Sequence, residues 1–100
     1  MARWKKPTKE EILENRRALA ERARTGDLRL PGAVADIRKG FGMTQEEFAK
    51  TLGLSRRQVA EMEAGTANPT LETLEKIGRL FGFAVGFVPR LGDAGSHVKT

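Results

Sequence analysis

The chain has 100 residues, 39% of them hydrophobic, and its 18 Lys and Arg against 13 Asp and Glu give a formal net charge of +5. This length fits one domain with a modest core. The lack of cysteine excludes disulfides and thiolate metal sites. No apolar run reaches the roughly 20 residues of a membrane span, and the basic N-terminus has no signal-peptide core. We therefore expect a cytoplasmic, nucleoid-associated protein that attracts polyanions such as nucleic acid.

Residues 1–29 are interpreted as a basic arm followed by an N-terminal helix. The arm carries Arg3, Lys5 and Lys6 around Trp4 and ends at Pro7. Thr8 and Glu11 have the spacing of a capping box, and Gly26 can end the helix. The pattern predicts a helix over residues 9–25 with an inner stripe of Ile12, Leu19 and Ala23.

Residues 30–90 contain four further predicted helices, and residues 91–100 are interpreted as a disordered tail. Pro31 fits the first turn of the second helix, which ends at Gly40. The third, fourth and fifth helices are predicted to start after Thr44, Ser55 and Thr70 and to end at Gly53, Gly65 and Gly82. The predicted buried positions are Val34, Ile37, Phe48, Ala49, Leu52, Val59, Met62, Leu71, Leu74, Ile77, Leu80 and Phe81.

The link between the third and fourth helices is very short. Gly53 can adopt a positive φ at the end of one helix, and Ser55 can cap the next after only one intervening residue, Leu54. Ala49 supplies the small residue that a close helix crossing needs. This spacing is typical of a helix-turn-helix, in which the second helix is presented outward.

The outward face of the fourth helix is predicted to be Arg56, Arg57, Ala60 and Glu61, because Val59 and Met62 are needed in the core. Two arginines at a helix start suit guanine, whose O6 and N7 atoms match a guanidinium fork. A lone Arg-Arg pair is more often a solvated surface, but the surrounding turn pattern favours DNA reading here. Thr44, Gln45 and Ser55, at two capped helix starts, are placed to hold phosphates.

The motif from Met43 to Lys50, followed by Leu52-Gly53-Leu54-Ser55 and by Val59 to Glu63 with Gly65, resembles the lambda-repressor-like (Cro/C1, or XRE) helix-turn-helix family. The resemblance covers about residues 31–82. It implies an all-α fold, namely a five-helix lambda-repressor-like domain with an added N-terminal helix. It also implies that Gln45 contacts the DNA backbone. By the same resemblance, Arg56, Arg57, Ala60 and Glu61 read bases, and Thr66 and Asn68 contact phosphate.

The segment from Phe83 to Val88 is apolar and predicted to be a β-strand. One strand in a helical protein has no sheet to join, so we expect it to pair with the same strand of a second molecule. Phe83, Val85 and Phe87 would form one side of this dimer interface. The alternative is an extended tail on its own core. A strand here is similar to HipB-type antitoxin repressors, which implies a dimeric repressor of a palindromic operator and a HipA-like kinase toxin as partner.

Other classes of function are less favoured, and we expect the protein not to be an enzyme. An enzyme is disfavoured, because the one histidine, His97, lies in the tail and the glutamates at helix starts are explained by capping. No cofactor or metal site is legible. A protein-interaction module would leave the two arginines unexplained, and salt-dependent DNA binding distinguishes it. A stand-alone phage-type or metabolic regulator competes with the antitoxin.

Overall fold

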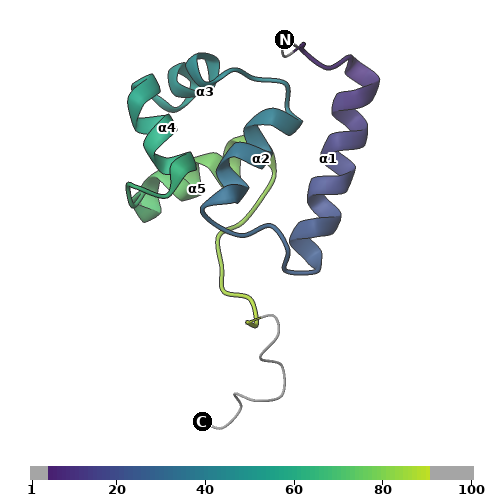
Figure 1. Cartoon of the computed structure of the whole chain (residues 1–100). Coiled ribbons are helices and arrows are strands. Elements are labelled where there is room, and N and C mark those ends of the chain that lie inside the picture. The colour runs from purple at the N-terminus through teal and green to yellow at the C-terminus, as the bar shows by residue number, and fades with distance from the viewer. Residues whose placement is uncertain (1–4, 91–100) are drawn as a thin grey trace, which may run out of the picture.

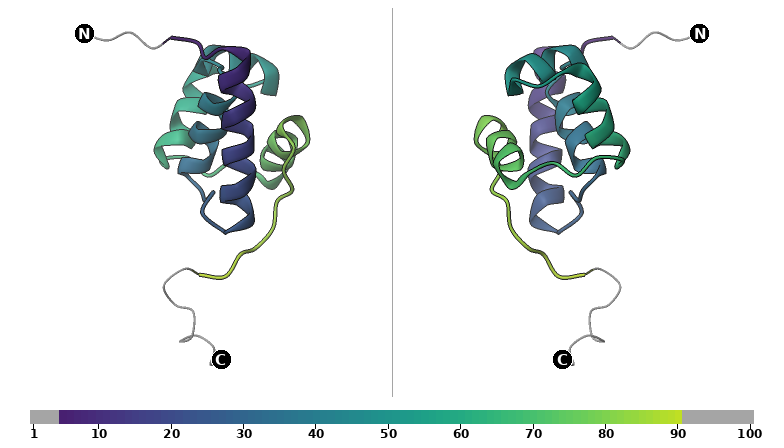
Figure 2. Two further views of the ribbon diagram at one scale, coloured as in Figure 1. Left: turned by 90° about the vertical axis from the view of Figure 1, so that its right-hand side faces the viewer. Right: turned by 90° about the vertical axis from the view of Figure 1, so that its left-hand side faces the viewer.

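The computed structural model describes residues 5–90, which form five helices (Figure 1). Two sequence predictions therefore lie outside the described residues: the arm residues Arg3 and Trp4, and the tail 91–100 with His97. The described chain begins and ends at opposite ends of the molecule, as Figure 2 also shows. The helices are α1 (Lys9–Arg24), α2 (Gly32–Gly40), α3 (Gln45–Leu52), α4 (Arg56–Ala64) and α5 (Leu71–Phe81).

The predicted capping residues set the helix boundaries. Thr8 and Thr44 form capping boxes with Glu11 and Glu47, and Thr70 accepts a hydrogen bond from the backbone N–H of Thr73. These contacts satisfy backbone donors that a helix start leaves unpaired. At the other ends, α3, α4 and α5 stop at glycines with positive φ, which are Gly53, Gly65 and Gly82.

The core lies where α2, α3, α4 and α5 meet. Phe48 and Val59 are completely buried, and Val34, Ile37, Ala49, Leu52, Met62 and Ile77 complete the cluster as predicted. The ring of Phe81 stacks on Phe48 at 5.4 Å and meets Phe41 edge-on at 4.8 Å between centroids. Such aromatic pairs add stability beyond the area they bury, so α5 is fixed to the helix-turn-helix core by its last residue.

Helix α1 lies against α2 through a close contact at one glycine (Figure 2). A side chain at Gly40 would meet Cδ1 of Leu19 at 2.6 Å, and the Asn15 side chain donates to the Gly40 carbonyl at 3.2 Å. Leu19 is the one fully buried residue of α1, while Ile12 is half-buried. The added N-terminal helix is therefore part of the same folded unit.

Two positions predicted to be buried in α5 are exposed. Leu71 and Leu80 keep 60% and 49% of their surface accessible, because the chain covers only the face that carries Ile77 and Gly78. The main chain turns back at the end of α5, where the N–H of Phe83 donates to the Gly78 carbonyl at 2.8 Å. A side chain at Gly78 would meet the Phe83 carbonyl oxygen at 2.3 Å, so the turn requires glycine at this position.

The predicted strand does not form within this chain. Residues 83–90 are extended but belong to no strand in the described part of the chain, because residues 84–88 make no backbone hydrogen bond to any other segment there. The prediction of a shared apolar side also needs correction. Phe83 is half-buried against the core, whereas Val85 is exposed and Phe87 is fully exposed. Thus the intramolecular packing covers only the first of the three side chains.

Candidate nucleic-acid interface

The corner between α3 and α4 has the geometry that the sequence predicts for a helix-turn-helix. Gly53 adopts φ +73°, and the N–H of Leu54 donates to the Ala49 carbonyl at 2.9 Å. The Leu54 side chain packs against the core, while Ala49 is buried beneath the corner. Ser55 then caps α4 by accepting from the backbone N–H of Gln58 at 3.1 Å. The corner therefore holds α4 in a fixed orientation on α3.

The start of α4 presents two arginines to solvent. Arg56 and Arg57 are exposed, while Val59 and Met62 are buried on the opposite side of the helix. Arg57 donates through Nε to the Glu61 carboxylate at 3.1 Å, one helical turn away. Glu61, which the sequence predicts to read bases, thus lies beside an arginine from the same predicted set. The terminal nitrogens of Arg57 stay free to reach a ligand, since the bond uses only Nε.

The start of α3 lies beside the start of α4 across a shallow hollow of about 600 Å³. Thr44, Gln45 and Arg56, all predicted from the sequence, line this hollow together. Lys39 also lines it but was not predicted, although its place at the basic end of α2, five residues before Thr44, is a usable signal. Backbone N–H groups at a helix start and nearby cations are suited to phosphate. The hollow therefore brings base-reading and backbone-binding candidates to one surface.

A buried ion pair beneath this surface joins α2 to α4. Arg38 contacts the Glu63 carboxylate at 2.6 Å and 3.1 Å, and both side chains are about nine-tenths buried. Arg38 also donates to the Met43 carbonyl at 2.8 Å, and the Gln45 amide donates to Glu63 at 3.0 Å. An amide has two protons, so this bond orients Gln45 and leaves one proton for a phosphate. The sequence analysis did not detect this network.

The remaining predicted contact residues surround the same two helices. Ala60 is half-buried in α4, and Asn68 is exposed in the loop after it. The Thr66 hydroxyl donates to the Glu61 carbonyl at 3.3 Å, so it also helps to end α4. Among residues 5–90 the structure has no acidic or histidine cluster suited to a metal ion, and no helix there is long and apolar enough to cross a membrane.

Comparison with known proteins identifies this arrangement. A family model described as helix-turn-helix matches residues 34–87, which is more than half of the chain. The chain belongs to the lambda-repressor-like helix-turn-helix family. The added helix α1 lies outside the matched region. In this chain α3 and α4 are the two helices of the family's helix-turn-helix motif.

Several relatives are named as regulators. An uncharacterized HTH-type transcriptional regulator of Archaeoglobus fulgidus is 42% identical over 48% of this chain and 69% of its own length. One from Methanothermobacter thermautotrophicus is 35% identical over 49% of this chain and 71% of its own. The cryptic phage CTXphi transcriptional repressor RstR of Vibrio cholerae is 33% identical over 52% of this chain and 47% of its own. No solved structure matches the chain significantly.

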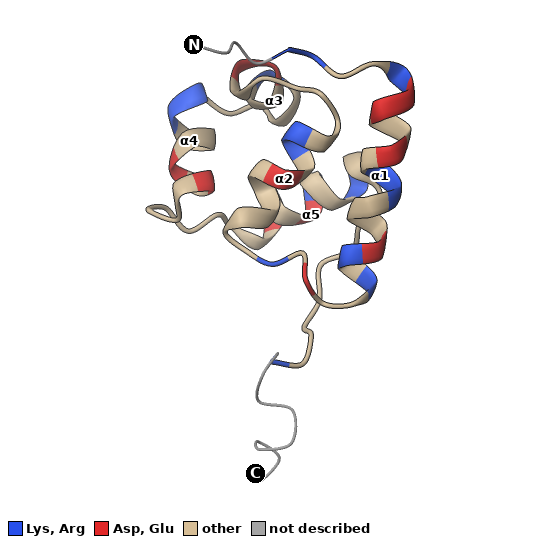
Figure 3. Cartoon of the chain, turned by 45° about the vertical axis from the view of Figure 1, so that its right-hand side comes forward, with Lys and Arg blue, Asp and Glu red and all other residues tan. Residues whose placement is uncertain are grey.

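A segment that precedes the matched region also reaches the family motif. Lys6 donates to the Glu47 carboxylate at 2.7 Å and to the Gly42 carbonyl at 2.8 Å. The Glu47 carboxylate accepts the backbone N–H of Thr44 with the same oxygen. Figure 3 shows the basic segment before α1 at the same end of the molecule as the basic start of α4. The Lys6 contact spans 41 residues, so no local pattern reveals it.

The Lys6 contact makes the stability of the protein depend on the protonation of Glu47. The Lys6 ammonium and the Thr44 backbone N–H lower the pKa of Glu47. A lowered pKa in the folded state means stability that is present above the unfolded pKa, about 4.3, and that is lost as pH falls through the folded value. We expect Lys6→Met to lose less stability than the wild type between about pH 6 and pH 3. Urea unfolding measures this, and parallel pH profiles would contradict it.

Proposed function

We propose that this protein is a sequence-specific DNA-binding transcriptional regulator that inserts α4 into the major groove. The observation that carries the proposal is that Arg56, which is followed by the exposed Arg57, lines one hollow with the start of α3. The buried Arg38–Glu63 pair supports it, because it holds the helices that present this surface in one arrangement. A protein-interaction module alone would not need arginines at this corner. A protein that binds the chromosome in this way would act in the cytoplasm, at the nucleoid.

Each predicted contact residue has a role in this proposal. Arg56 and Arg57 read base edges with Ala60, while Glu61 orients Arg57 or accepts from a cytosine amine. Thr44, Gln45 and Ser55 hold phosphates at the helix starts, and Lys39 is added to this set. Thr66 and Asn68 hold phosphate beyond the end of α4.

Replacing Arg56 or Arg57 with Ala should reduce specific binding by about 1 to 3 kcal/mol, because each change removes a guanidinium fork from a base edge. The operator is first selected from a random duplex library with the full chain. Fluorescence anisotropy then compares the selected duplex with a random-sequence duplex. Binding to random DNA should change much less.

The matched control is Arg24→Ala, which removes an exposed arginine of the same charge from the far end of α1. It should leave both affinities within about twofold, since the C-terminal end of α1 lies far from the start of α4 (Figure 3). Equal losses on both duplexes would make Arg56 and Arg57 phosphate contacts instead of base readers. If the selection enriches no sequence, the proposal of sequence-specific DNA binding is contradicted.

We further propose that the regulator is a dimeric repressor of a palindromic operator, formed through residues 83–88. The backbone N–H and C=O groups of residues 84–88 make no hydrogen bond within the described chain. Phe87 is fully exposed and Val85 is nearly half exposed. An extended segment with free edges and apolar side chains favours pairing with a second copy. The two-fold symmetry would match two half-sites about one helical turn apart.

The biological context has two candidates. The similarity to a phage repressor of Vibrio cholerae favours a stand-alone phage-type regulator. A HipB-type antitoxin with a HipA-like kinase partner is supported by the resemblance at the junction between α5 and the extended segment. Co-expression with the protein encoded by the neighbouring gene and gel filtration of the mixture distinguish them. A stable complex with a kinase-like neighbour supports the antitoxin, and a regulator that elutes alone supports the phage-type regulator.

A further inference from the structure

The segment before α1 is built onto the helix-turn-helix by several contacts. Pro7 is half-buried over Gly42, where a side chain would meet two of its ring carbons at 3.1 Å. Ile12 closes the same site from the first turns of α1, at 3.3 Å from that position. Gly42 itself has φ +73°. The turn before α3 is therefore shaped to receive this segment, which lies outside the matched family region.

The ion pair between Lys6 and Glu47 joins this segment to the first turn of α3, next to Thr44 and Gln45. Glu47 is needed there, because its carboxylate completes the capping box. A carboxylate at this position would also repel a phosphate bound at the same helix start. Lys6 contacts that carboxylate at 2.7 Å and so cancels its charge. The pair is about half exposed on both sides, hence it stays within reach of a bound polyanion.

We propose that residues 5–8 are part of the DNA-binding surface, in which Lys6 acts as a positioning residue that neutralises Glu47 and fixes the turn preceding α3. The inference rests on the proposed function and adds a role for a segment that the family motif lacks. Lys6 acts through Glu47 in this scheme and makes no phosphate contact of its own. A basic arm that acts only by its charge would instead contact the phosphates directly.

The test compares Lys6→Met, Lys6→Met/Glu47→Gln and Lys6→Met/Glu46→Gln in the full chain. Glutamine at position 47 keeps the capping box, as Gln58 does for Ser55 in α4. Glu46 is the neighbouring exposed carboxylate at the same helix start, so its change controls for a general loss of negative charge. Binding to the selected operator duplex is measured by anisotropy between about 50 and 200 mM salt. Thermal melting followed by circular dichroism reports folding.

Lys6→Met should weaken operator binding about three- to tenfold at about 50 mM salt and less at about 200 mM, because salt screens the repulsion between an unpaired Glu47 carboxylate and the DNA phosphates. Adding Glu47→Gln should return the affinity to within about twofold of the wild type, while adding Glu46→Gln should recover clearly less, because Glu46 lines the hollow but is not the partner of Lys6. A slope reduced by about 0.9 with no recovery would make Lys6 a direct phosphate contact. An unchanged affinity for Lys6→Met would show that this segment is not part of the DNA-binding surface.

Three further outcomes distinguish a failure of this inference from a failure of the proposed function. If the wild type binds no selected duplex, the proposed function fails and the Lys6 variants are not its cause. If the wild type binds but the Glu46 variant recovers as well as the Glu47 variant, only the inference about the pair fails. A Lys6→Met variant that melts at lower temperature but keeps its operator affinity at about 10 °C also overturns it, since the role is then structural.

Discussion

Glu63→Ala should lower the free energy of unfolding by about 3 to 5 kcal/mol, because it leaves the Arg38 guanidinium buried without its carboxylate. Only the Met43 carbonyl would still accept from Arg38. For a domain of this size such a loss is a large part of the total stability. Urea unfolding monitored by circular dichroism measures it. The matched control is Glu21→Ala, which removes the carboxylate of an exposed pair of similar length and should cost less than about 1 kcal/mol.

A double variant separates stability from DNA binding. Arg38→Met with Glu63→Leu replaces the buried pair by apolar side chains, so most of the lost stability should return. Gln45 nevertheless loses the carboxylate that orients its amide. We therefore expect a folded protein that binds its operator more weakly than the wild type. A double variant that binds normally would show that Gln45 needs no orientation, and a Glu63→Ala loss no larger than that of Glu21→Ala would contradict the stability prediction.

Truncation after Gly82 should reduce affinity for the full palindrome by about 10²- to 10⁴-fold, towards that of a half-site. The change removes the extended segment that we propose to pair across the dimer, together with the core contacts of Phe83 and the exposed ring of Phe87. Light scattering at several concentrations measures the dimer, and anisotropy on whole and half operators measures the avidity. Because Phe83 contacts the core, melting must show that the shortened chain still folds.

A point variant protects this prediction from a folding artefact. Phe87→Asp changes a side chain that is fully exposed in the single chain, so the fold of one molecule should not depend on it. It should weaken the dimer, because it places a charge where apolar surface is buried. Leu13→Asp, on the exposed side of α1, is the matched control and should leave the dimer intact. A truncated chain or a Phe87→Asp variant that remains dimeric would place the interface elsewhere.

The local features of the fold were predictable because their signals are local. Thr44, Ser55 and Thr70 cap their helices as predicted, and helix ends at Gly53, Gly65 and Gly82 follow from backbone freedom at those glycines. The 3.6-residue spacing of apolar side chains also located most of the core. The family motif consists of these same caps, glycines and apolar positions, so the amino-acid sequence alone was enough to identify the helix-turn-helix.

The features that the sequence analysis missed depend on contacts between distant residues. Arg38 and Glu63 are 25 positions apart, and Lys6 and Glu47 are 41 apart. Neither spacing distinguishes a pair from two solvated side chains. Helical periodicity assigned Leu71 and Leu80 to the core, but how much of a helix face is covered depends on the tertiary arrangement. The predicted strand needs a partner that a single chain does not contain.

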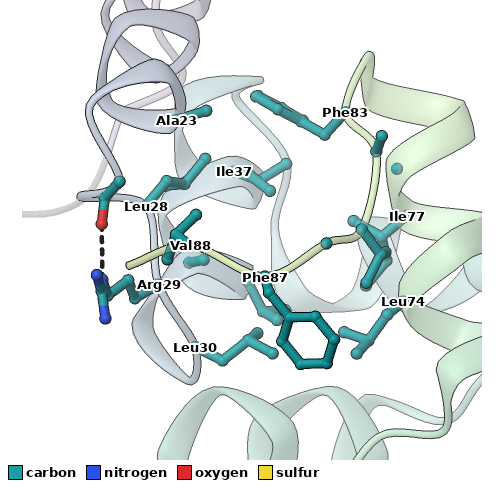
Figure 4. Close-up of a pocket in the computed structure, with 17 residues that line it drawn as sticks. Ala23, Leu28, Arg29, Leu30, Ile37, Leu74, Ile77, Phe83, Phe87 and Val88 are labelled. Atoms are coloured by element: carbon teal, nitrogen blue, oxygen red, sulfur yellow. Dashed lines mark hydrogen bonds between the residues drawn. The ribbon is translucent and has the colours of Figure 1, made fainter. Parts of the chain in front are cut away.

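The extended segment after α5 is held at both of its ends. At one end the Phe83 N–H bonds to the Gly78 carbonyl, and at the other the Arg29 guanidinium donates to the Pro89 carbonyl. Arg29 is itself fixed at 2.6 Å from the Gly26 carbonyl, the bond drawn in Figure 4, where Phe87 also points away from Ile37. Between these points the segment forms one wall of an apolar hollow of about 550 Å³, which α2, α5 and residues 28–30 also line.

A segment fixed at two points serves as a rigid spacer and not as a flexible tether. If two molecules join through it, the distance and rotation between their recognition helices are set by the protein body. One base pair inserted between the half-sites turns them by about 35° and separates them by about 3.4 Å, since B-DNA has about 10 to 10.5 base pairs per turn. Because a flexible linker would absorb that change and a rigid spacer cannot, such a regulator recognises the spacing of its operator as strictly as its bases.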